Sequence, residues 1–207
     1  MTQAPTRRER ERERHRNEIL DAAEAVFSEK GYHGTTVEDV AARAEFSVGT
    51  LYNFFAGKDE LYNVLIEERL QQLRDDAFEI LDQADGTEDI IKMYIKGKIE
   101  LSQKYFSFGK LYMRERLGDR FSGNKLWTEV VAPVHKEIFE RLLTIFREGL
   151  KQGVLRKDLS AEDMAITIDA MTDGFMFEWF MHPNEYPLDE KYTTMVRLFF
   201  EGVKNNS

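Results

Sequence analysis

The chain has 207 residues, of which 42% are hydrophobic, enough for a sizeable core in one domain or two. It contains no cysteine, which excludes disulfides, thiolate nucleophiles and cysteine-ligated zinc or iron–sulfur sites. The formal net charge of −9 disfavours nucleic acid as a partner, although a small basic patch can act on an acidic body. No apolar run reaches the ~20 residues of a membrane span, and the N-terminus lacks the apolar part of a secretory signal, so we expect a soluble, cytoplasmic protein.

Apolar residues recur at helical spacing along the chain, and no segment alternates convincingly at the period of a strand. This predicts an all-α fold of about nine helices. The expected helices cover residues 14–30, 37–44, 48–55, a long segment that ends near 83, 88–117 with a possible interruption at 105–110, a segment that ends near 152, a segment that ends near 181, and 189–204. Residues 83–89 and 118–124 are expected to be breaks.

Several residues indicate where helices begin and end. Gly31 is suited to end the first helix, and Ser160 is suited to cap the helix that ends near 181. Thr35 or Thr36, followed three residues later by an acidic residue, indicates a capping box. Pro133 is either a first-turn residue or a kink. We predict two domains from this organisation: residues 1–56, called the head, and residues 57–207, called the body.

The two short helices of the head each have an apolar side suited to a core, and the third helix also has a small, polar side suited to a surface. The second helix carries one apolar stripe, at Val37, Val40, Ala41 and Ala44. The third helix has its apolar stripe at Val48, Leu51 and Phe55. At about 100° per residue, its small and polar residues then point away from the core; these are Gly49, Thr50 and Asn53. Two such helices joined by a short turn indicate a helix-turn-helix, whose second helix can enter a DNA major groove.

The outer side chains of the third helix fit that interpretation. Ser47 and Tyr52 can each offer a hydroxyl to a phosphate, and Thr50 and Asn53 can bond to base edges. Gly49 removes bulk where the backbone would approach the bases. Lys58, just beyond, can meet a backbone phosphate. The alternative is a helical hairpin whose outer face is only solvated.

Residues 19–65 resemble the DNA-binding domain of TetR-family transcriptional regulators. The match follows the family's motifs along two stretches, "GYHGTTVEDVAARA" and "SVGTLYNFFAGKDEL". The rest of the chain is similar to the family only in layout. The resemblance implies a homodimer in which two heads bind neighbouring major grooves of a palindromic operator. It also implies a body that binds a small-molecule effector, hydrophobic or amphipathic, and then releases the DNA, most often as a repressor.

The family's pattern assigns roles to eight positions of this sequence. Contacts to the phosphate backbone fall on Thr35, Ser47, Tyr52 and Lys58, and contacts to base edges fall on Val48, Gly49, Thr50 and Asn53. For Val48 the helical pattern disagrees, because it points that side chain inward.

Two residues depart from the family. Glu45 stands where the turn usually has glycine, so a left-handed backbone there would cost roughly 1 kcal/mol. Phe54 stands where histidine is common, which removes a phosphate donor.

The body is expected to contain an apolar effector pocket and a dimer interface formed by the last two helices. The residues expected to line the pocket are Phe106, Phe108, Tyr112, Met113, Phe146, Met171, Thr172 and Phe175. The residues expected at the interface are Met164, Ile168, Trp179, Tyr192, Met195, Val196, Phe199 and Val203. Ordinary packing within one chain is the alternative for both sets. Thr172 and Asp173 place polar groups on an otherwise apolar helix, where they could orient a ligand, bond across the dimer or face water.

The N-terminal segment "RRERERERHR" has two interpretations. It is either a solvated extension of the first helix or an arm that reaches the minor groove of DNA.

Two other classes of function compete with a regulator. An enzyme is disfavoured, because the sequence has no Gly-rich phosphate loop, no G-x-S-x-G elbow and no H-E-x-x-H motif. Glu178 and His182 share a helix face but make a poor metal signal, so we expect no metal, no catalytic residue and no cofactor. A helical protein that binds a protein partner and has a vestigial head is the third class, and binding to duplex DNA separates it from a regulator.

Overall fold

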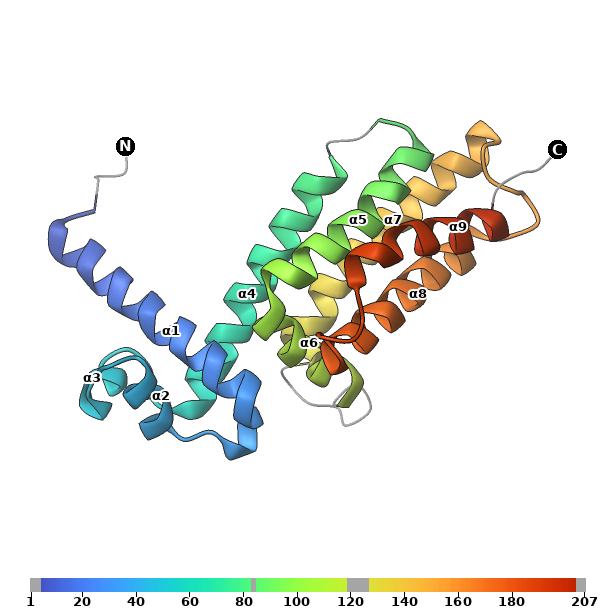
Figure 1. Cartoon of the computed structure of the whole chain (residues 1–207). Helices are drawn as coiled ribbons and strands as arrows, with labels where there is room; N and C mark the ends of the chain where they lie inside the picture. Colours follow the sequence, from blue (N-terminus) through green and yellow to red (C-terminus); the bar gives the residue numbers. More distant parts are fainter. Residues whose placement is uncertain (1–4, 83–84, 119–126, 204–207) are drawn as a thin grey trace.

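The structure, a computed structural model, describes residues 5–82, 85–118 and 127–203, and these residues form an all-helical protein (Figure 1). The predicted fold class is confirmed, with nine α-helices in the described residues. They are α1 (Arg7–Gly34), α2 (Val37–Arg43), α3 (Val48–Tyr52), α4 (Lys58–Leu81), α5 (Thr87–Lys104), α6 (Phe106–Gly118), α7 (Ala132–Gln152), α8 (Ala161–Met181) and α9 (Lys191–Val203). A π-helical turn at Trp127–Val131 precedes α7, and a 3₁₀ turn at Leu188–Glu190 precedes α9. None of the described helices is both long and apolar enough to cross a membrane.

Most helix ends follow the signals in the sequence. Thr36 forms the expected capping box with Asp39, and the Ser160 hydroxyl accepts a hydrogen bond from the backbone N–H of Asp163. Gly31 has a φ of 73° and interrupts α1 where the sequence predicts its end. Pro133 lies in the first turn of α7, so it begins a helix and does not kink one. The expected interruption within residues 88–117 occurs at Tyr105, between α5 and α6. The predicted loop at 118–124 lies largely outside the described residues.

The beginning of α1 differs from the prediction. The helix begins at Arg7, seven residues before the expected start, because Thr6 and Glu9 form a second capping box. The backbone N–H of Glu9 donates to the Thr6 hydroxyl at 3.3 Å, and the backbone N–H of Thr6 donates to the Glu9 carboxylate at 2.7 Å. The expectation at residue 14 relied on apolar periodicity, which the arginine- and glutamate-rich segment does not have.

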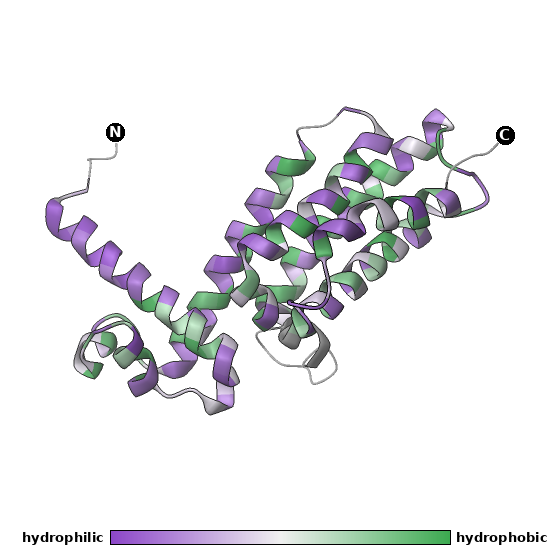
Figure 2. Ribbon diagram, in the orientation of Figure 1, coloured by the Kyte–Doolittle hydropathy of each residue, from purple (hydrophilic) through white to green (hydrophobic). Residues whose placement is uncertain are grey.

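Buried hydrophobic side chains form two clusters, one at each end of α4. The head cluster joins α1, α2, α3 and the first half of α4, and it includes Phe108 and Leu111 of α6 and Val131 and Val134 around the start of α7. The body cluster joins the end of α4 with α5, α7, α8 and α9. Figure 2 shows hydrophobic residues where these helices meet and hydrophilic residues on their outer sides. The domain boundary at residue 56 stays a prediction, because α4 contributes to both clusters.

The turn between α2 and α3 contains the left-handed residue that the sequence suggests. Glu45 has a φ of 59° and is the one non-glycine residue with positive φ in the described chain. A side chain in this region costs about 1–2 kcal/mol, whereas glycine adopts it freely. The turn therefore stores a small amount of strain directly before the third helix.

Replacing Glu45 with glycine is therefore expected to stabilise the protein by roughly 0.5–1 kcal/mol, since the relief of strain exceeds the greater chain entropy of glycine in the unfolded state. The free energy of unfolding, measured in urea, tests this. The matched control is Ala42→Gly, an exposed position in α2, which should lose about 1 kcal/mol. A loss of stability in Glu45→Gly as large as that of the control would contradict the assignment of strain.

Candidate DNA-binding surface and effector cavity

The third helix presents a small polar surface at the end of the molecule away from the body (Figure 1). Leu51 and Phe55 are buried in the head cluster, whereas Gly49, Tyr52 and Asn53 are exposed. Tyr52 is 54% exposed, although large aromatic side chains are usually buried for most of their surface. The orientation therefore follows the stripe pattern of the sequence, although α3 ends at Tyr52 and not at residue 55.

The first turn of α3 is fixed by its cap. The Ser47 hydroxyl accepts a hydrogen bond from the backbone N–H of Thr50 at 3.0 Å and lies 2.8 Å from the Thr50 hydroxyl. Thr50 and Val48 are half-buried, and Val48 packs against the head cluster. Both expectations for Val48, as a core residue and as a surface contact, are compatible with this position. The cap holds Ser47, Gly49 and Thr50 in one rigid turn at the surface.

Two residues expected to contact phosphate, Thr35 and Lys58, make hydrogen bonds within the chain. The Thr35 side chain is 1% exposed, and its hydroxyl donates to the carbonyl of Gly31 at 2.8 Å. A phosphate cannot reach that hydroxyl, so the expected contact through the Thr35 side chain is corrected to a positioning role. The Lys58 ammonium donates to the carbonyls of Tyr32 and Thr35, each at 3.0 Å, and lies 4.4 Å from the centre of the Tyr32 ring.

These contacts join the end of α1 to the start of α4. The Tyr32 hydroxyl donates to the carboxylate of Asp59, and this hydrogen bond raises the pKa of Tyr32 to about 12. Lys58 thereby satisfies the carbonyl of Tyr32 in the last turn of α1 and that of Thr35, which directly follows the helix. Helices α2 and α3 are held between these two anchored ends. An ammonium has three N–H donors, so Lys58 keeps one for a further acceptor.

The body contains a cavity of about 110 Å³. Its lining is mostly apolar and comes from α4, α5, α6, α7 and α8. The lining residues are Leu73, Ala77, Tyr94, Lys98, Leu101, Ser102, Tyr105, Phe108, Gly109, Tyr112, Met113, His135, Ile138, Asp169, Asp173, Met176 and Phe180. Three of the eight expected pocket residues are among them: Phe108, Tyr112 and Met113.

The other five expected pocket residues lie elsewhere. Phe146 and Thr172 are fully buried, and the Thr172 hydroxyl donates to the carbonyl of Ile168 within its own helix. Phe106, Met171 and Phe175 pack against the body cluster. Four of these five are aromatic or methionine residues, a property that core and pocket residues share, so composition does not separate the two; the fifth, Thr172, is the polar residue whose hydroxyl the sequence leaves open to a ligand.

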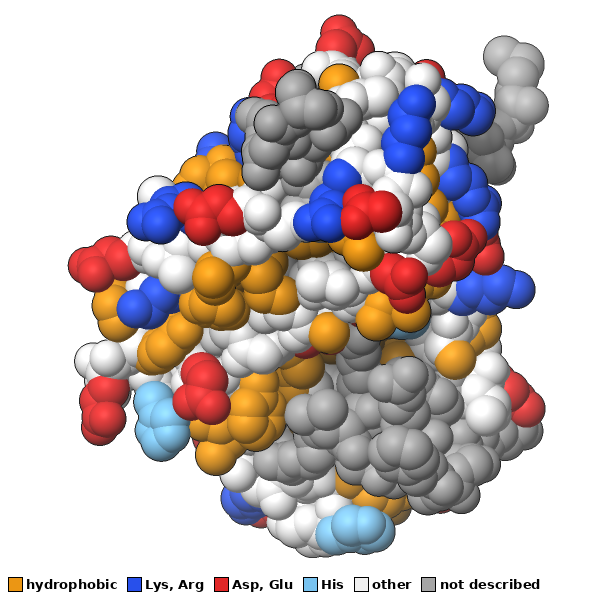
Figure 3. All heavy atoms as spheres, turned by 90° about the vertical axis from the view of Figure 1, so that its right-hand side faces the viewer, with side chains coloured by type: hydrophobic (Ala, Val, Ile, Leu, Met, Phe, Trp, Pro, Cys, Tyr) orange, Lys and Arg blue, Asp and Glu red, His pale blue; other side chains and the backbone are white. Residues whose placement is uncertain are grey.

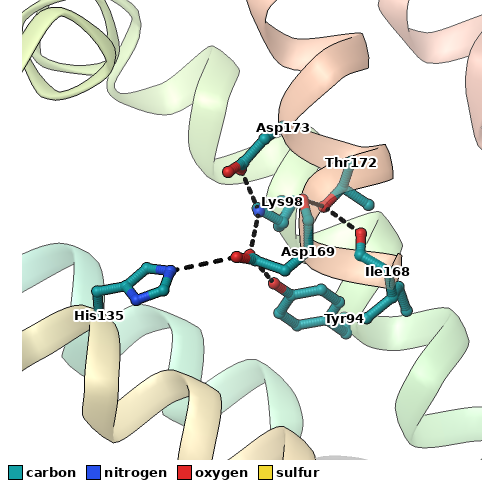
Figure 4. A network of polar contacts seen from close by, with 7 residues as sticks. All are labelled: Tyr94, Lys98, His135, Ile168, Asp169, Thr172 and Asp173. Atoms are coloured by element: carbon teal, nitrogen blue, oxygen red, sulfur yellow. Dashed lines mark hydrogen bonds and ion pairs between the residues drawn. The ribbon is translucent and has the colours of Figure 1, made fainter. Parts of the chain in front are cut away.

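One wall of the cavity is polar, and the sequence suggested only part of it (Figure 4). Asp169 lies at its centre, where it accepts hydrogen bonds from the Tyr94 hydroxyl at 3.0 Å and the Lys98 ammonium at 3.1 Å. The other oxygen of Asp169 lies 3.1 Å from His135 Nε2, and Lys98 also pairs with Asp173 at 2.6 Å. Burial raises the pKa of the Tyr94 hydroxyl above its ordinary value, so it remains a donor.

A groove adjoins this wall, lined mainly by residues of α7 and α8. Its lining residues are Met113, His135, Lys136, Phe139, Ile166, Asp169, Ala170, Asp173, Gly174 and Phe177. Four of them also line the cavity: Met113, His135, Asp169 and Asp173. The polar wall therefore borders both the cavity and the groove.

The structure corrects part of the expected dimer interface. Four of the eight residues are fully buried within their own chain and cannot meet a second copy: Met164, Ile168, Met195 and Phe199. Trp179, Tyr192 and Val196 are half-buried and pack against the body cluster, and the side chain of Val203 lies outside the described residues. The reason is that α8 has two apolar stripes, and periodicity alone does not say which one faces the core.

Other hydrophobic residues of these helices reach the surface. Ile166, Phe177 and Met181 of α8 are 56%, 39% and 59% exposed, and Leu198 of α9 is 56% exposed. Figure 3 shows hydrophobic side chains in patches between charged ones on the face of the body that is on the right in Figure 1. Such exposure of large apolar side chains is typical of surfaces that bind a partner.

Comparisons with known proteins agree with this arrangement. Residues 19–65 match the family described as bacterial regulatory proteins of the tetR family, and residues 126–199 match the C-terminal domain of BetI-type transcriptional repressors. The chain is 25% identical over 199 residues to the HTH-type transcriptional repressor DhaR of Mycobacterium sp. (strain GP1), covering 93% of this chain and 96% of that protein.

Two solved structures share the fold. The regulator FadR from Bacillus subtilis, in complex with stearoyl-CoA, has a TM-score of 0.74 at 23% identity, covering 90% of this chain and 98% of the other. The ketosteroid regulator KstR2 of Mycobacterium tuberculosis has a TM-score of 0.77 at 20% identity, covering 92% and 95%. Because its N-terminal and C-terminal parts both match family models and its head contains the helix-turn-helix, the chain belongs to the TetR family, whose members are DNA-binding transcriptional regulators and not enzymes.

Proposed function

We propose that the protein is a homodimeric repressor that binds a palindromic operator through α3 and leaves it when a small hydrophobic or amphipathic effector enters the body. The observation that carries the proposal is the exposed face of α3, where Gly49, Tyr52 and Asn53 point outward while Leu51 and Phe55 anchor the helix. The head (1–56) would bind DNA, and the body (57–207) would bind the effector and the second copy.

The chemistry of the α3 face suits a major groove. Asn53 and Thr50 can bond to base edges, and the absence of a side chain at Gly49 lets the backbone approach the bases. Val48, at the first turn, can add an apolar contact. Ser47, Tyr52 and the remaining donor of Lys58 suit the phosphate backbone on either side. Two such faces, one per copy, would match two half-sites one helical turn apart.

An exposed stripe on α8 suits the second copy. Ile166, Ala170, Gly174, Phe177 and Met181 follow one another at spacings of four, four, three and four residues, which places them on one side of the helix. Large side chains at both ends and small ones between them form a shallow, self-complementary surface. A two-fold axis across this stripe would let α8 pack against its own copy. Leu198 of α9 would extend the contact.

The cavity suits an amphipathic effector, because its lining is apolar except for the wall around Asp169. FadR was solved in complex with stearoyl-CoA, an amphipathic molecule, and KstR2 is described as a ketosteroid regulator, which supports an effector with a large apolar part. The 110 Å³ of this cavity is smaller than the ~150 Å³ that suffices for benzene, so such a molecule would have to enlarge it.

Enlargement of the cavity would move α8, the helix that also carries the proposed dimer surface. The wall residues Asp169 and Asp173 belong to α8, as does the exposed stripe, and they line both the cavity and the groove. An effector that displaces this wall would favour a different packing of the two α8 helices and so a different distance between the two α3 helices. Because half-sites allow little error in spacing, a population shift of this kind would release the DNA.

Two substitutions at the C-terminal end of α3, at Tyr52 and at its cap residue Asn53, test the proposed DNA binding. A duplex selected by the wild-type protein from a random-sequence library serves as the probe. Asn53→Ala is expected to change the selected sequence and to weaken binding by about 1–3 kcal/mol per half-site, because it removes a side chain that can bond to a base edge.

Tyr52→Phe removes one hydroxyl and is expected to weaken binding to all sequences alike. Electrophoretic shifts at fixed salt measure both. If the wild-type protein selects no sequence from the library, the proposal is rejected.

A further inference from the structure

The first half of α1 extends beyond the head cluster as a solvated rod. From Arg7 to Ile19, its first buried residue, α1 rises by about 18 Å. Figure 2 shows this part as hydrophilic, and Figure 1 shows it alongside α3 at the end of the molecule opposite the body. The first sixteen residues contain six arginines and three glutamates, in a chain whose net charge is −9. The rod is therefore a local positive region on an acidic protein.

One side of the rod is attached to the helix-turn-helix. The Arg12 guanidinium lies 5.6 Å from the centre of the Phe54 ring, directly after α3, and Arg16 lies 5.8 Å from the ring of Phe55. Between them, the His15 ring lies 5.1 Å from that of Phe46, in the turn before α3. These contacts fix the orientation of the rod relative to the third helix.

The arginines of this side differ in their charge partners. Arg16 forms an ion pair with Glu68 of α4, and the hydrogen bond to Glu68 raises the pKa of Arg16. The charge of Arg16 is therefore neutralised within the chain. Arg12 has no ion pair within the part of the chain that the structure describes, and the face of Phe54 holds its guanidinium in place. Arg8 lies one turn earlier on the same side, four residues from Arg12.

We propose that Arg12, with Arg8 one turn earlier, binds phosphates of the DNA strand that borders the groove occupied by α3. The inference rests on the proposed DNA-binding function and adds a contact surface outside the helix-turn-helix. Phe54 has no group that can bond to a phosphate, but it supports a guanidinium that can. Phosphate is the occupant because an exposed, positioned guanidinium matches it in charge and in geometry.

The same geometry disfavours the minor-groove arm that the sequence left open. From Arg7 onward the segment is a capped α-helix, with a diameter of about 10–12 Å including side chains. The minor groove of B-DNA is about 6 Å wide, so this rod cannot enter it. Arginines on its side can still reach the phosphates at the groove edge.

The salt dependence of binding tests the inference. The probe is the duplex selected by the wild-type protein, and the variants are Arg12→Ala and, as matched control, Arg14→Ala. Arg14 carries the same charge on another side of the rod, where it pairs with Glu18. Each lost phosphate contact reduces the slope of log K against log salt by about 0.9, so a dimer of Arg12→Ala should lose about 1.8 and bind on the order of tenfold more weakly. Arg14→Ala should keep the wild-type slope.

The outcomes separate this inference from the proposed function. If the wild-type protein selects a sequence but Arg12→Ala and Arg14→Ala have equal slopes, the phosphate contact is rejected and the regulator stands. If no protein variant binds duplex DNA specifically, the proposed function itself fails. Arg12→Lys keeps the charge and should restore the slope; a slope that stays as low as in Arg12→Ala would mean that stacking on Phe54, and not a phosphate contact, explains the loss.

Discussion

Replacing Gly49 with leucine is expected to abolish sequence-specific DNA binding while the protein stays folded. A Cβ atom at this position would meet only Ser47 Oγ, at the ordinary contact distance of 3.8 Å. Leucine also favours a helix over glycine, so the free energy of unfolding should rise by roughly 0.5–1 kcal/mol. The new side chain would, however, stand between α3 and the bases at both half-sites, and a loss on the order of a hundredfold or more is expected.

Thermal unfolding and electrophoretic shifts on the selected duplex measure these two opposite effects. Gly49→Ala is the graded control, because its single methyl group should stabilise the helix similarly and weaken binding far less. If Gly49→Leu binds the duplex as tightly as the wild-type protein, α3 does not approach the bases at this residue, and the proposed orientation of the helix on DNA is wrong.

Replacing Phe177 with glutamate is expected to separate the two copies without unfolding either. Phe177 is 39% exposed on the α8 stripe and belongs to neither buried cluster, so the isolated chain should stay folded when it is changed. In a two-fold interface each copy would lose the burial of this exposed part of the ring, roughly 0.6–1.2 kcal/mol, and would also have to bury a charge. The dissociation constant of the dimer should therefore rise by about a hundredfold or more, and operator binding should fall with it.

Sedimentation at several protein concentrations gives the oligomeric state. The informative comparison is Ile168→Ala on the buried side of the same helix, which should lower the free energy of unfolding by about 2–5 kcal/mol, because it leaves a cavity in the body cluster. A wild-type protein that remains monomeric when concentrated, or a Phe177→Glu variant that remains dimeric, would remove the α8 stripe from the interface.

The head could be predicted largely from the sequence because its signals are local. A capping box joins residues three apart, and the stripes of α2 and α3 each span two turns, so Thr36, Ser47 and the outward face at Gly49 and Asn53 follow from near neighbours. The early start of α1 also has a local signal, the T-x-x-E pattern at Thr6. Apolar periodicity does not extend to this segment, so a prediction based on periodicity places the start of the helix too late.

The body could not be predicted in the same way because its site depends on distant residues. Lys98 and Asp169 are 71 positions apart, and nothing in either local segment indicates that they form one wall of a cavity. The two apolar stripes on α8 leave the choice of inner side open, so the sequence predicts Met164 and Ile168 at an interface, whereas the structure buries these two and exposes Ile166 and Phe177. Only the packing of α8 against α5 and α7 resolves that choice.

The core beneath the DNA-binding helices is not made by those helices alone. Leu61, Leu65 and Leu70 of α4, together with Phe108 and Val131 from farther along the chain, complete it. A segment excised at residue 56 would leave that interior half built and exposed to water. A chimaera that joins this N-terminal unit to the C-terminal domain of another protein would therefore have to include α4. It would also need residues that replace the contacts of Phe108 and Val131 with the head cluster.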